Sequence, residues 1–300
     1  MAGEIALDII NRQEWLDPLG DQVQKGVHGV FESAGVPGQK VKNALHGTWL
    51  GHPLHPVLTD IPVGAWTVAL VCDALEDITG RKEFAKGADL AVAVGLAGAV
   101  GSALTGISDW SDTDGRARKV GLVHGMMNLG GTLLYGASLT FRKQKKRNLG
   151  RGFGLLGYAI AFGAAYLGGE LVYGEQVGVN HAAGGPPLPA KFVPVLADSE
   201  LREGELKKVD AKGVPVLLVR HNAQVCAIAE TCTHAGGPLS EGKIEGDTVV
   251  CPWHGSRFNL ETGKVVDGPA THAAPSLETR VHKGQIEVRS GTGIPAGVGR

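Results

Sequence analysis

The chain has 300 residues, a formal net charge of −1 and 43% hydrophobic residues. A nearly neutral chain without a basic patch is not built to bind nucleic acid, and four cysteines are too few for a disulfide-held fold. The averages conceal two unlike halves, because the apolar residues are concentrated before residue 175.

The first segment, residues 1–45, is polar but carries apolar residues at helical spacing, among them Ile9, Leu16, Val23 and Val27. Such spacing predicts an amphipathic helix that lies on a membrane surface. The alternative is a cap that packs on the helices that follow.

Four apolar runs follow within residues 46–175. Residues 90–107, 120–141 and 152–169 contain no Asp, Glu, Lys or Arg, whereas residues 57–75 contain two aspartates. About 20 apolar residues suffice to cross a bilayer. We therefore predict a four-helix transmembrane bundle, and a multi-pass protein of the bacterial inner membrane. Buried helices of a soluble domain are the alternative.

The orientation in the membrane stays open. The connectors 80–87 and 141–151 hold nine Lys or Arg, against six close to the other ends of the helices. This bias favours a C-terminal half outside the cytoplasm. The first twenty residues, however, include several charges and no apolar signal region.

Histidines mark the membrane region. His124 lies within an apolar run, and His52 and His55 flank the start of another. Ionisable residues within a membrane are functional candidates. These three could ligate a b-type haem, as paired imidazoles do in other bundles, or bind quinone; hydrogen bonds between helices are the alternative. The motif His-Pro-Leu-His-Pro at 52–56 resembles an uncharacterised family of four-helix bacterial membrane domains, over about residues 45–180, which implies no activity.

The second half begins after a Pro- and Gly-containing linker, residues 176–190, and residues 291–300 are typical of a flexible tail. Between them, short β-rich runs such as 214–219 and 285–288 are bounded by Gly, Asp or Pro. This spacing predicts a small antiparallel β domain over residues 191–290.

Two short stretches in this domain indicate a metal site. They are Cys232-Thr233-His234 and, after 16 intervening residues, Cys251-Pro252-Trp253-His254. Each offers one thiolate and one imidazole. Two cysteines and two histidines also suit a structural zinc ion, but zinc fingers usually place both cysteines in one knuckle and both histidines in the other. An iron–sulfur cluster with unequal ligands is the other candidate.

The pattern resembles the Rieske [2Fe-2S] family. Gly255-Ser256 and Gly268-Pro269-Ala270 also match that family's second ligand loop and its proline loop. The resemblance covers roughly residues 190–290 and implies stacked small sheets with the ligand loops at one tip. Gly237 and Trp253 stand where respiratory members have an extra disulfide, so the chain looks more like Rieske-type ferredoxins.

The resemblance also implies roles for individual residues. Cys232 and Cys251 would hold one iron, and His234 and His254 the other. The backbone and side chains expected to surround the cluster belong to Gly236, Gly255, Ser256 and Pro269.

Together these features predict a membrane-anchored carrier of single electrons, with a [2Fe-2S] cluster and an unidentified donor and acceptor, either proteins or quinone. A redox or oxygen sensor is the main alternative. An electron-transfer component of an oxygenase or reductase is another. A complete oxygenase would need a further mononuclear iron site, for which no catalytic residue is evident, and whether the chain is itself an enzyme stays open.

Overall fold

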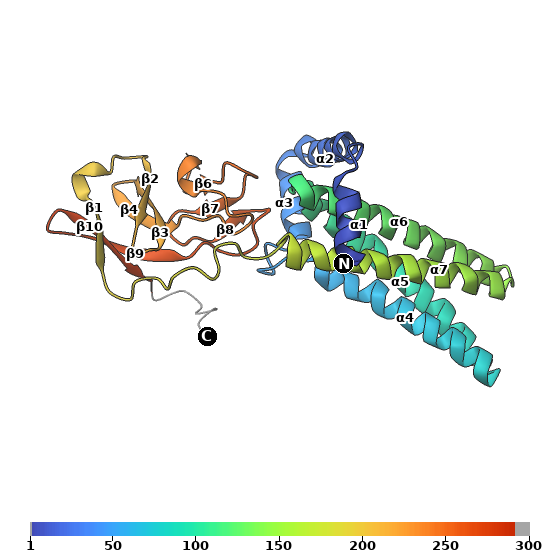
Figure 1. Ribbon diagram of the computed structural model, residues 1–300. Helices are drawn as coiled ribbons and strands as arrows, with labels where there is room; N and C mark the ends of the chain where they lie inside the picture. The colour runs from blue at the N-terminus through green and yellow to red at the C-terminus, as the bar shows by residue number, and fades with distance from the viewer. Residues whose placement is uncertain (1, 292–300) are drawn as a thin grey trace. The chain divides into compact units, whose positions relative to one another are not determined.

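The computed structural model describes residues 2–291 and has a helical N-terminal part followed by an all-β C-terminal part (Figure 1). This confirms the predicted fold class. The predicted tail lies, apart from Gly291, outside the described residues. Contacts divide the chain into a helical unit, Met1–Val41 with Pro53–Val177, and a β unit, Lys42–His52 with Gly178–Arg300.

The N-terminal segment forms three helices, α1 (Ala2–Asn11), α2 (Leu16–Ser33) and α3 (Gly35–His46). Leu7 of α1 and Leu16 of α2 are buried in a cluster with Val120 and Leu167 from the long helices. Arg118 also pairs with Asp17 at 3.1 Å. The first two helices therefore pack on the bundle, which is the second of the two placements that the sequence left open.

Four long helices form two antiparallel hairpins, in which α4 packs along α5 and α6 along α7. Their bounds are α4 (His55–Thr79), α5 (Lys82–Ser111), α6 (Gly115–Lys143) and α7 (Arg147–Gly169), and a π-helical turn (Glu170–Gly174) continues α7. Gly80 ends α4 with a left-handed φ of 69°, which a glycine adopts without steric cost. Short turns of this kind allow the two helices of a hairpin to pack along their whole length.

Three of these helices are long and apolar enough to cross a membrane: His55–Thr79, Lys82–Ser111 and Arg147–Gly174. Helix α6 contains the predicted run 120–141 but is not among them. Its apolar stretch includes His124 and Asn128, which lower its hydropathy. The predicted count of four transmembrane helices thus stays a prediction.

Small residues let large aromatic rings into the centre of the bundle. Trp66 stacks on Tyr135 with ring centroids 4.0 Å apart. A Cβ at Gly95 would lie 2.2 Å from Nε1 of Trp66, and one at Gly157 would lie 3.1 Å from Cδ2 of Tyr135. Glycine at position 95 is therefore a packing requirement, and a side chain at position 157 would press on the Tyr135 ring; small residues are usual where membrane helices approach closely.

The β unit consists of two antiparallel sheets. The six-stranded sheet has the order β1-β10-β9-β4-β3-β2, and the four-stranded sheet the order β5-β6-β7-β8. The bounds are β1 (Val193–Ala197), β2 (Leu206–Asp210), β3 (Pro215–His221), β4 (Gln224–Ala229), β5 (Lys243–Glu245), β6 (Thr248–Val250), β7 (Arg257–Asn259), β8 (Val265–Asp267), β9 (Ser276–His282) and β10 (Gln285–Ser290).

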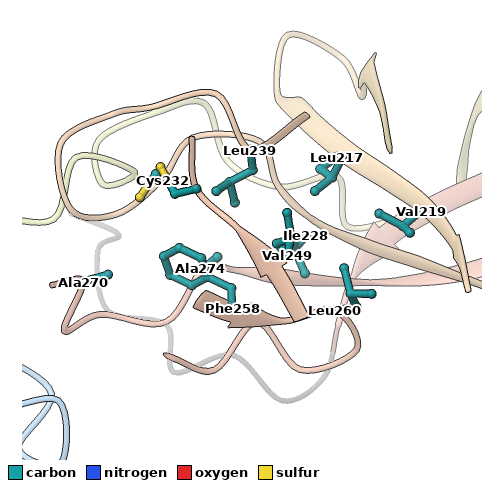
Figure 2. Close-up of a cluster of buried hydrophobic side chains, with 11 residues drawn as sticks. Leu217, Val219, Ile228, Cys232, Leu239, Val249, Phe258, Leu260, Ala270 and Ala274 are labelled. Atoms are coloured by element: carbon teal, nitrogen blue, oxygen red, sulfur yellow. The ribbon is translucent and has the colours of Figure 1, made fainter. Parts of the chain in front are cut away.

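One hydrophobic core joins these sheets to the predicted metal site. Leu217, Ile228 and Phe258 are fully buried in it, and Cys232 belongs to the same cluster (Figure 2). Because the core continues up to the first predicted ligand, its packing holds the ligand loop in place.

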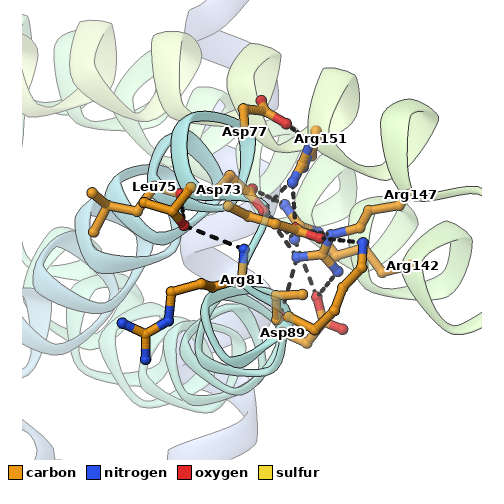
Figure 3. Close-up of polar contacts among 12 residues, drawn as sticks. Asp73, Leu75, Asp77, Arg81, Asp89, Arg142, Arg147 and Arg151 are labelled. Atoms are coloured by element: carbon orange, nitrogen blue, oxygen red, sulfur yellow. Dashed lines mark hydrogen bonds and ion pairs between the residues drawn. The ribbon is translucent and has the colours of Figure 1, made fainter.

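A cluster of ion pairs joins the two hairpins at the end where α4 meets α5 and α6 meets α7 (Figure 3). Arg142 of α6 is 2% exposed and donates from Nη1 to Asp73 of α4 at 2.8 Å. Arg147 of α7 donates to Asp89 of α5 at 2.8 Å. Arg151 also pairs with Asp73. Basic residues that the sequence offered as orientation signals are thus partners of carboxylates on the other hairpin, among which Asp73 is buried.

We predict that Arg142→Ala lowers the free energy of unfolding by about 3 kcal/mol, because Asp73 would keep its buried charge and lose its best partner. The loss stays near the lower end of the usual range because Arg147 and Arg151 still reach Asp73. Unfolding of the full chain in detergent measures it, with the exposed Lys143→Ala as control. Equal stability of both variants would contradict the prediction.

Candidate metal centre

The first predicted ligand loop follows strand β4 and closes on itself. The backbone N–H of Cys232 donates to the carbonyl of Gly237 at 2.8 Å, and the N–H of Gly236 donates to the carbonyl of Cys232 at 3.0 Å. Gly236 has a φ of 82°, in the left-handed region that glycine tolerates. The carboxylate of Glu230, at the base of the loop, accepts hydrogen bonds from the backbone and hydroxyl of Ser240.

The second loop follows strand β6 and repeats this geometry. The N–H of Cys251 donates to the carbonyl of Ser256 at 2.8 Å, and the N–H of Gly255 donates to the carbonyl of Cys251 at 3.1 Å. Gly255 has a φ of 75°. Both loops therefore need glycine four residues after the cysteine, and the two predicted cofactor-binding glycines are explained by backbone conformation.

The structure brings the four predicted ligands together as two pairs. Cys232 and Cys251 are buried, and their thiols share a hydrogen bond. The rings of His234 and His254 have centroids 4.9 Å apart and planes at 84°. Both rings are half-buried with their Nδ1 atoms shielded from solvent. The two thiols and the two Nδ1 atoms are thus shielded from solvent, whereas the rest of each imidazole is partly exposed.

Backbone donors surround the two sulfurs. The N–H groups of His234 and Ala235 donate to the sulfur of Cys232, and those of Trp253 and His254 donate to the sulfur of Cys251. The hydrogen bond from Cys232 and these donors lower the pKa of Cys251 to about 6. The same thiol pairing, together with burial, raises the pKa of Cys232. Of the two sulfurs, that of Cys251 is therefore held as thiolate, the form that binds metal.

Gly237 leaves no room for a side chain beside this sulfur pair. A Cβ there would lie 3.0 Å from Sγ of Cys251 and 3.0 Å from Cδ2 of Trp253. The indole of Trp253 therefore packs against the backbone of Gly237. These are the two positions at which the resemblance places a disulfide in the respiratory members of the family. All four cysteines of the chain are free thiols.

The proline loop reaches the second ligand loop through Ser256. The hydroxyl of this fully buried serine accepts a hydrogen bond from the N–H of Ala270 at 3.0 Å. The chain segment that contains Pro269 is thereby held next to the Cys251 loop. The predicted role of Ser256 thus includes a structural bond within the chain.

The structure also shows partners that the sequence did not indicate. The Thr233 hydroxyl donates to the carbonyl of His272 at 2.7 Å, and its own carbonyl accepts from the N–H of His181 at 3.1 Å. Burial lowers the pKa of His272. Thr233 is buried. Its position in the sequence between two predicted ligands is the only sequence signal that could have revealed it.

The three histidines that the sequence analysis assigned to the membrane region behave differently. His55 and His124 are brought together, with ring centroids 6.4 Å apart, whereas His52 belongs to the β unit. Nδ1 of His55 is 2.9 Å from the carbonyl of Ser102, and Nδ1 of His124 is 2.7 Å from that of Ala164. Nε2 of His124 is 3.1 Å from the amide of Asn128. Both nitrogens of His124 are thus engaged, Nδ1 with Ala164 of α7 and Nε2 with Asn128 of its own helix, and haem ligation is not supported.

Within residues 2–291, no group of three or more His, Cys, Asp or Glu side chains is placed to bind one metal ion. Two thiols and two imidazoles in separate pairs match the division of ligands in a cluster whose two irons take different ligands. Fold and site together define an iron–sulfur class of protein.

Comparison with known proteins identifies two families. The Rieske [2Fe-2S] domain family matches residues 191–279, and the family described as "Predicted membrane protein (DUF2231)" matches residues 51–181. The ferredoxin CarAc of Metapseudomonas resinovorans is 35% identical over 98 residues, which are 32% of this chain and 92% of that protein. The chain belongs to the Rieske [2Fe-2S] family.

Two further matches cover a similar share of the chain. Human apoptosis-inducing factor 3 is 33% identical over 91 residues, 30% of this chain, and the chain covers only 15% of that protein. The ferredoxin of carbazole 1,9a-dioxygenase from Nocardioides aromaticivorans IC177, a solved structure, is 27% identical and has a TM-score of 0.33 over 34% of this chain and 100% of that one.

We predict that Gly237→Ala destabilises the β unit by about 1–3 kcal/mol, because the added methyl presses on the Cys251 sulfur and the Trp253 ring. Thermal unfolding of the full chain and iron content per chain measure the effect. Gly185→Ala is the matched control, since a Cβ there meets nothing within 4 Å. If both variants retain iron and stability equally, the packing argument fails.

Proposed function

We propose that the chain is a membrane-anchored Rieske electron carrier in which Cys232 and Cys251 hold one iron and His234 and His254 the other. The observation that carries this proposal is the pair of identically closed loops, which present two buried thiols and two inward-facing Nδ1 atoms. When bound, a [2Fe-2S] cluster supplies reversible one-electron chemistry, at a higher potential than a cluster with four cysteine ligands.

The chain's own residues tune that chemistry. The four backbone N–H groups aimed at the two sulfurs favour negative charge there, and hydrogen bonds to sulfur are one determinant of cluster potential. The half-buried imidazoles leave an edge toward solvent, where an electron partner can approach. Leu217 and Phe258 exclude water from the opposite side.

The membrane anchor is supported by the match to the membrane-protein family and by the three apolar helices. We retain the predicted boundaries as proposals: an N-terminal segment over 1–45, a transmembrane bundle over 46–175, a linker over 176–190 and the cluster domain over 191–290. A bacterial inner membrane and lipid contacts belong to the same proposal.

The partner is proposed to be another oxidoreductase. The ferredoxin component of the naphthalene 1,2-dioxygenase system of Pseudomonas putida is 26% identical over 97% of its length, and its name places it in an oxygenase system. By analogy, the present chain passes electrons to or from a protein of that kind, or to quinone in the membrane. A redox sensor built on the same cluster is the alternative function.

We predict that His254→Cys lowers the midpoint potential by more than ~100 mV. The substitution replaces a neutral imidazole on the histidine-bound iron with a negatively charged thiolate, which favours the oxidised cluster. Protein-film voltammetry of the full chain measures the potential. His282→Cys is the control, since this histidine is 51% exposed at the end of β9. An unchanged potential would remove His254 from the ligand set, and a redox-silent protein that contains zinc would replace the proposal with the structural-metal alternative.

We also predict that the full chain stays in the pellet when membranes are washed with carbonate, because three helices are long and apolar enough to be held in the lipid bilayer. Immunodetection in pellet and supernatant measures the partition. Recovery in the supernatant would contradict the anchor.

A further inference from the structure

A short segment far from the metal motif belongs to the β unit. Residues Lys42–His52, at the end of α3 and just after it, cluster with Gly178–Arg300. The two family matches, residues 51–181 and 191–279, leave Asn43 and His46 outside both. These two residues nevertheless contact the proline loop.

The side-chain amide of Asn43 makes two hydrogen bonds to adjacent residues of the β unit. Its Nδ2 donates to Oδ1 of Asp267 at 2.8 Å, and its Oδ1 accepts from the N–H of Gly268 at 3.0 Å. One side-chain amide thus hydrogen-bonds both the carboxylate of Asp267, the last residue of β8, and the backbone N–H of Gly268, the first residue of the proline loop. The fixed geometry of an amide makes such a double contact directional.

Packing supports these hydrogen bonds. His46 is 1% exposed. A Cβ at Gly268 would lie 3.3 Å from Cδ2 of His46 and 3.3 Å from Cγ2 of Thr48. Residues 42–48 therefore fit closely over the start of the proline loop, and a side chain at Gly268 would press on His46 and Thr48.

From the proline loop a chain of hydrogen bonds leads to a predicted ligand. The N–H of Ala270 donates to the Ser256 hydroxyl at 3.0 Å, and the Ser256 carbonyl accepts from the N–H of Cys251 at 2.8 Å. Asp267, the other partner of Asn43, also pairs with Arg257 at 3.4 Å. A shift of Asp267 or Gly268 would therefore displace the Cys251 loop in two ways, through Ala270 and Ser256 or through Arg257, which follows Ser256 in the chain.

We propose that Asn43 is a positioning residue for the metal centre. It fixes the proline loop next to Ser256, and so keeps the loop that carries the proposed ligand Cys251 in its closed conformation. The expected effect on retention of the cluster rests on the proposed function, whereas the hydrogen bonds of Asn43 do not depend on it. A cluster domain cut to the family boundaries would lack this support.

The first test compares wild type, Asn43→Ala and Lys40→Ala in the full chain in detergent. Lys40 is exposed on the same helix, so its replacement controls for effects on α3. In Asn43→Ala we expect faster hydrogen exchange at Gly268, and visible absorption lost to an iron chelator about fivefold faster, the factor that one lost hydrogen bond gives. Wild-type rates at both readouts in Asn43→Ala would overturn the inference.

The second test reverses the hydrogen bond. Asn43→Asp sets a carboxylate against Asp267, so we expect a loss of absorption faster than in Asn43→Ala. Combining Asn43→Asp with Asp267→Asn restores a donor and an acceptor with their direction exchanged, and should slow the loss again. A double variant as fast as Asn43→Asp alone would show that this hydrogen bond does not hold the loop.

The two proposals fail in different ways. Wild-type protein without iron and sulfide would refute the proposed function whatever happens at Gly268. Iron-loaded wild type, with exchange at Gly268 unaffected by Asn43→Ala, would refute only the positioning role.

Discussion

Closure of the two ligand loops is the constraint on which the metal centre depends. In each loop the cysteine N–H bonds a carbonyl five residues ahead, and a left-handed glycine turns the chain back. This folding points the following backbone N–H groups at the sulfur. A buried thiolate is costly without such donors, so one arrangement both shapes the loop and makes the site able to carry negative charge.

The unequal ligand set follows from the same geometry. The cysteines lie at the edge of the hydrophobic core, whereas the histidines are half-buried at the surface of the site. Sulfur is thereby kept from water, and imidazole is left where a partner can approach. Trp253 packs beside Gly237, so the two loops are joined by packing where other members of the family have a disulfide.

Much of this could be predicted because it is local in sequence. A motif or an apolar run is formed by residues that are close in the chain, and it can be recognised from those residues alone. This holds for the short β runs, the apolar stretches and the spacing of Cys232, His234, Cys251 and His254. The rest depends on residues distant in the chain. Asn43 meets Asp267 across 224 positions, and no spacing rule indicates such a contact.

The helical unit shows the same limit. Basic residues near helix ends indicated orientation, but Arg142 and Arg147 are partners of Asp73 and Asp89 on the other hairpin. A charge count cannot distinguish a solvated arginine from a paired one. Likewise His124 was a reasonable haem candidate by position, and only its hydrogen bonds to Ala164 and Asn128 show how it is used.

The central claim is that two thiols and two imidazoles hold an iron–sulfur cluster. Metal and sulfide analysis with EPR of the anaerobically purified, reduced full chain tests it most directly. The account predicts ~2 iron atoms per chain, matching sulfide, and a rhombic signal that disappears in Cys251→Ala. Zinc in place of iron, or an iron- and sulfide-loaded protein without that signal, would contradict it.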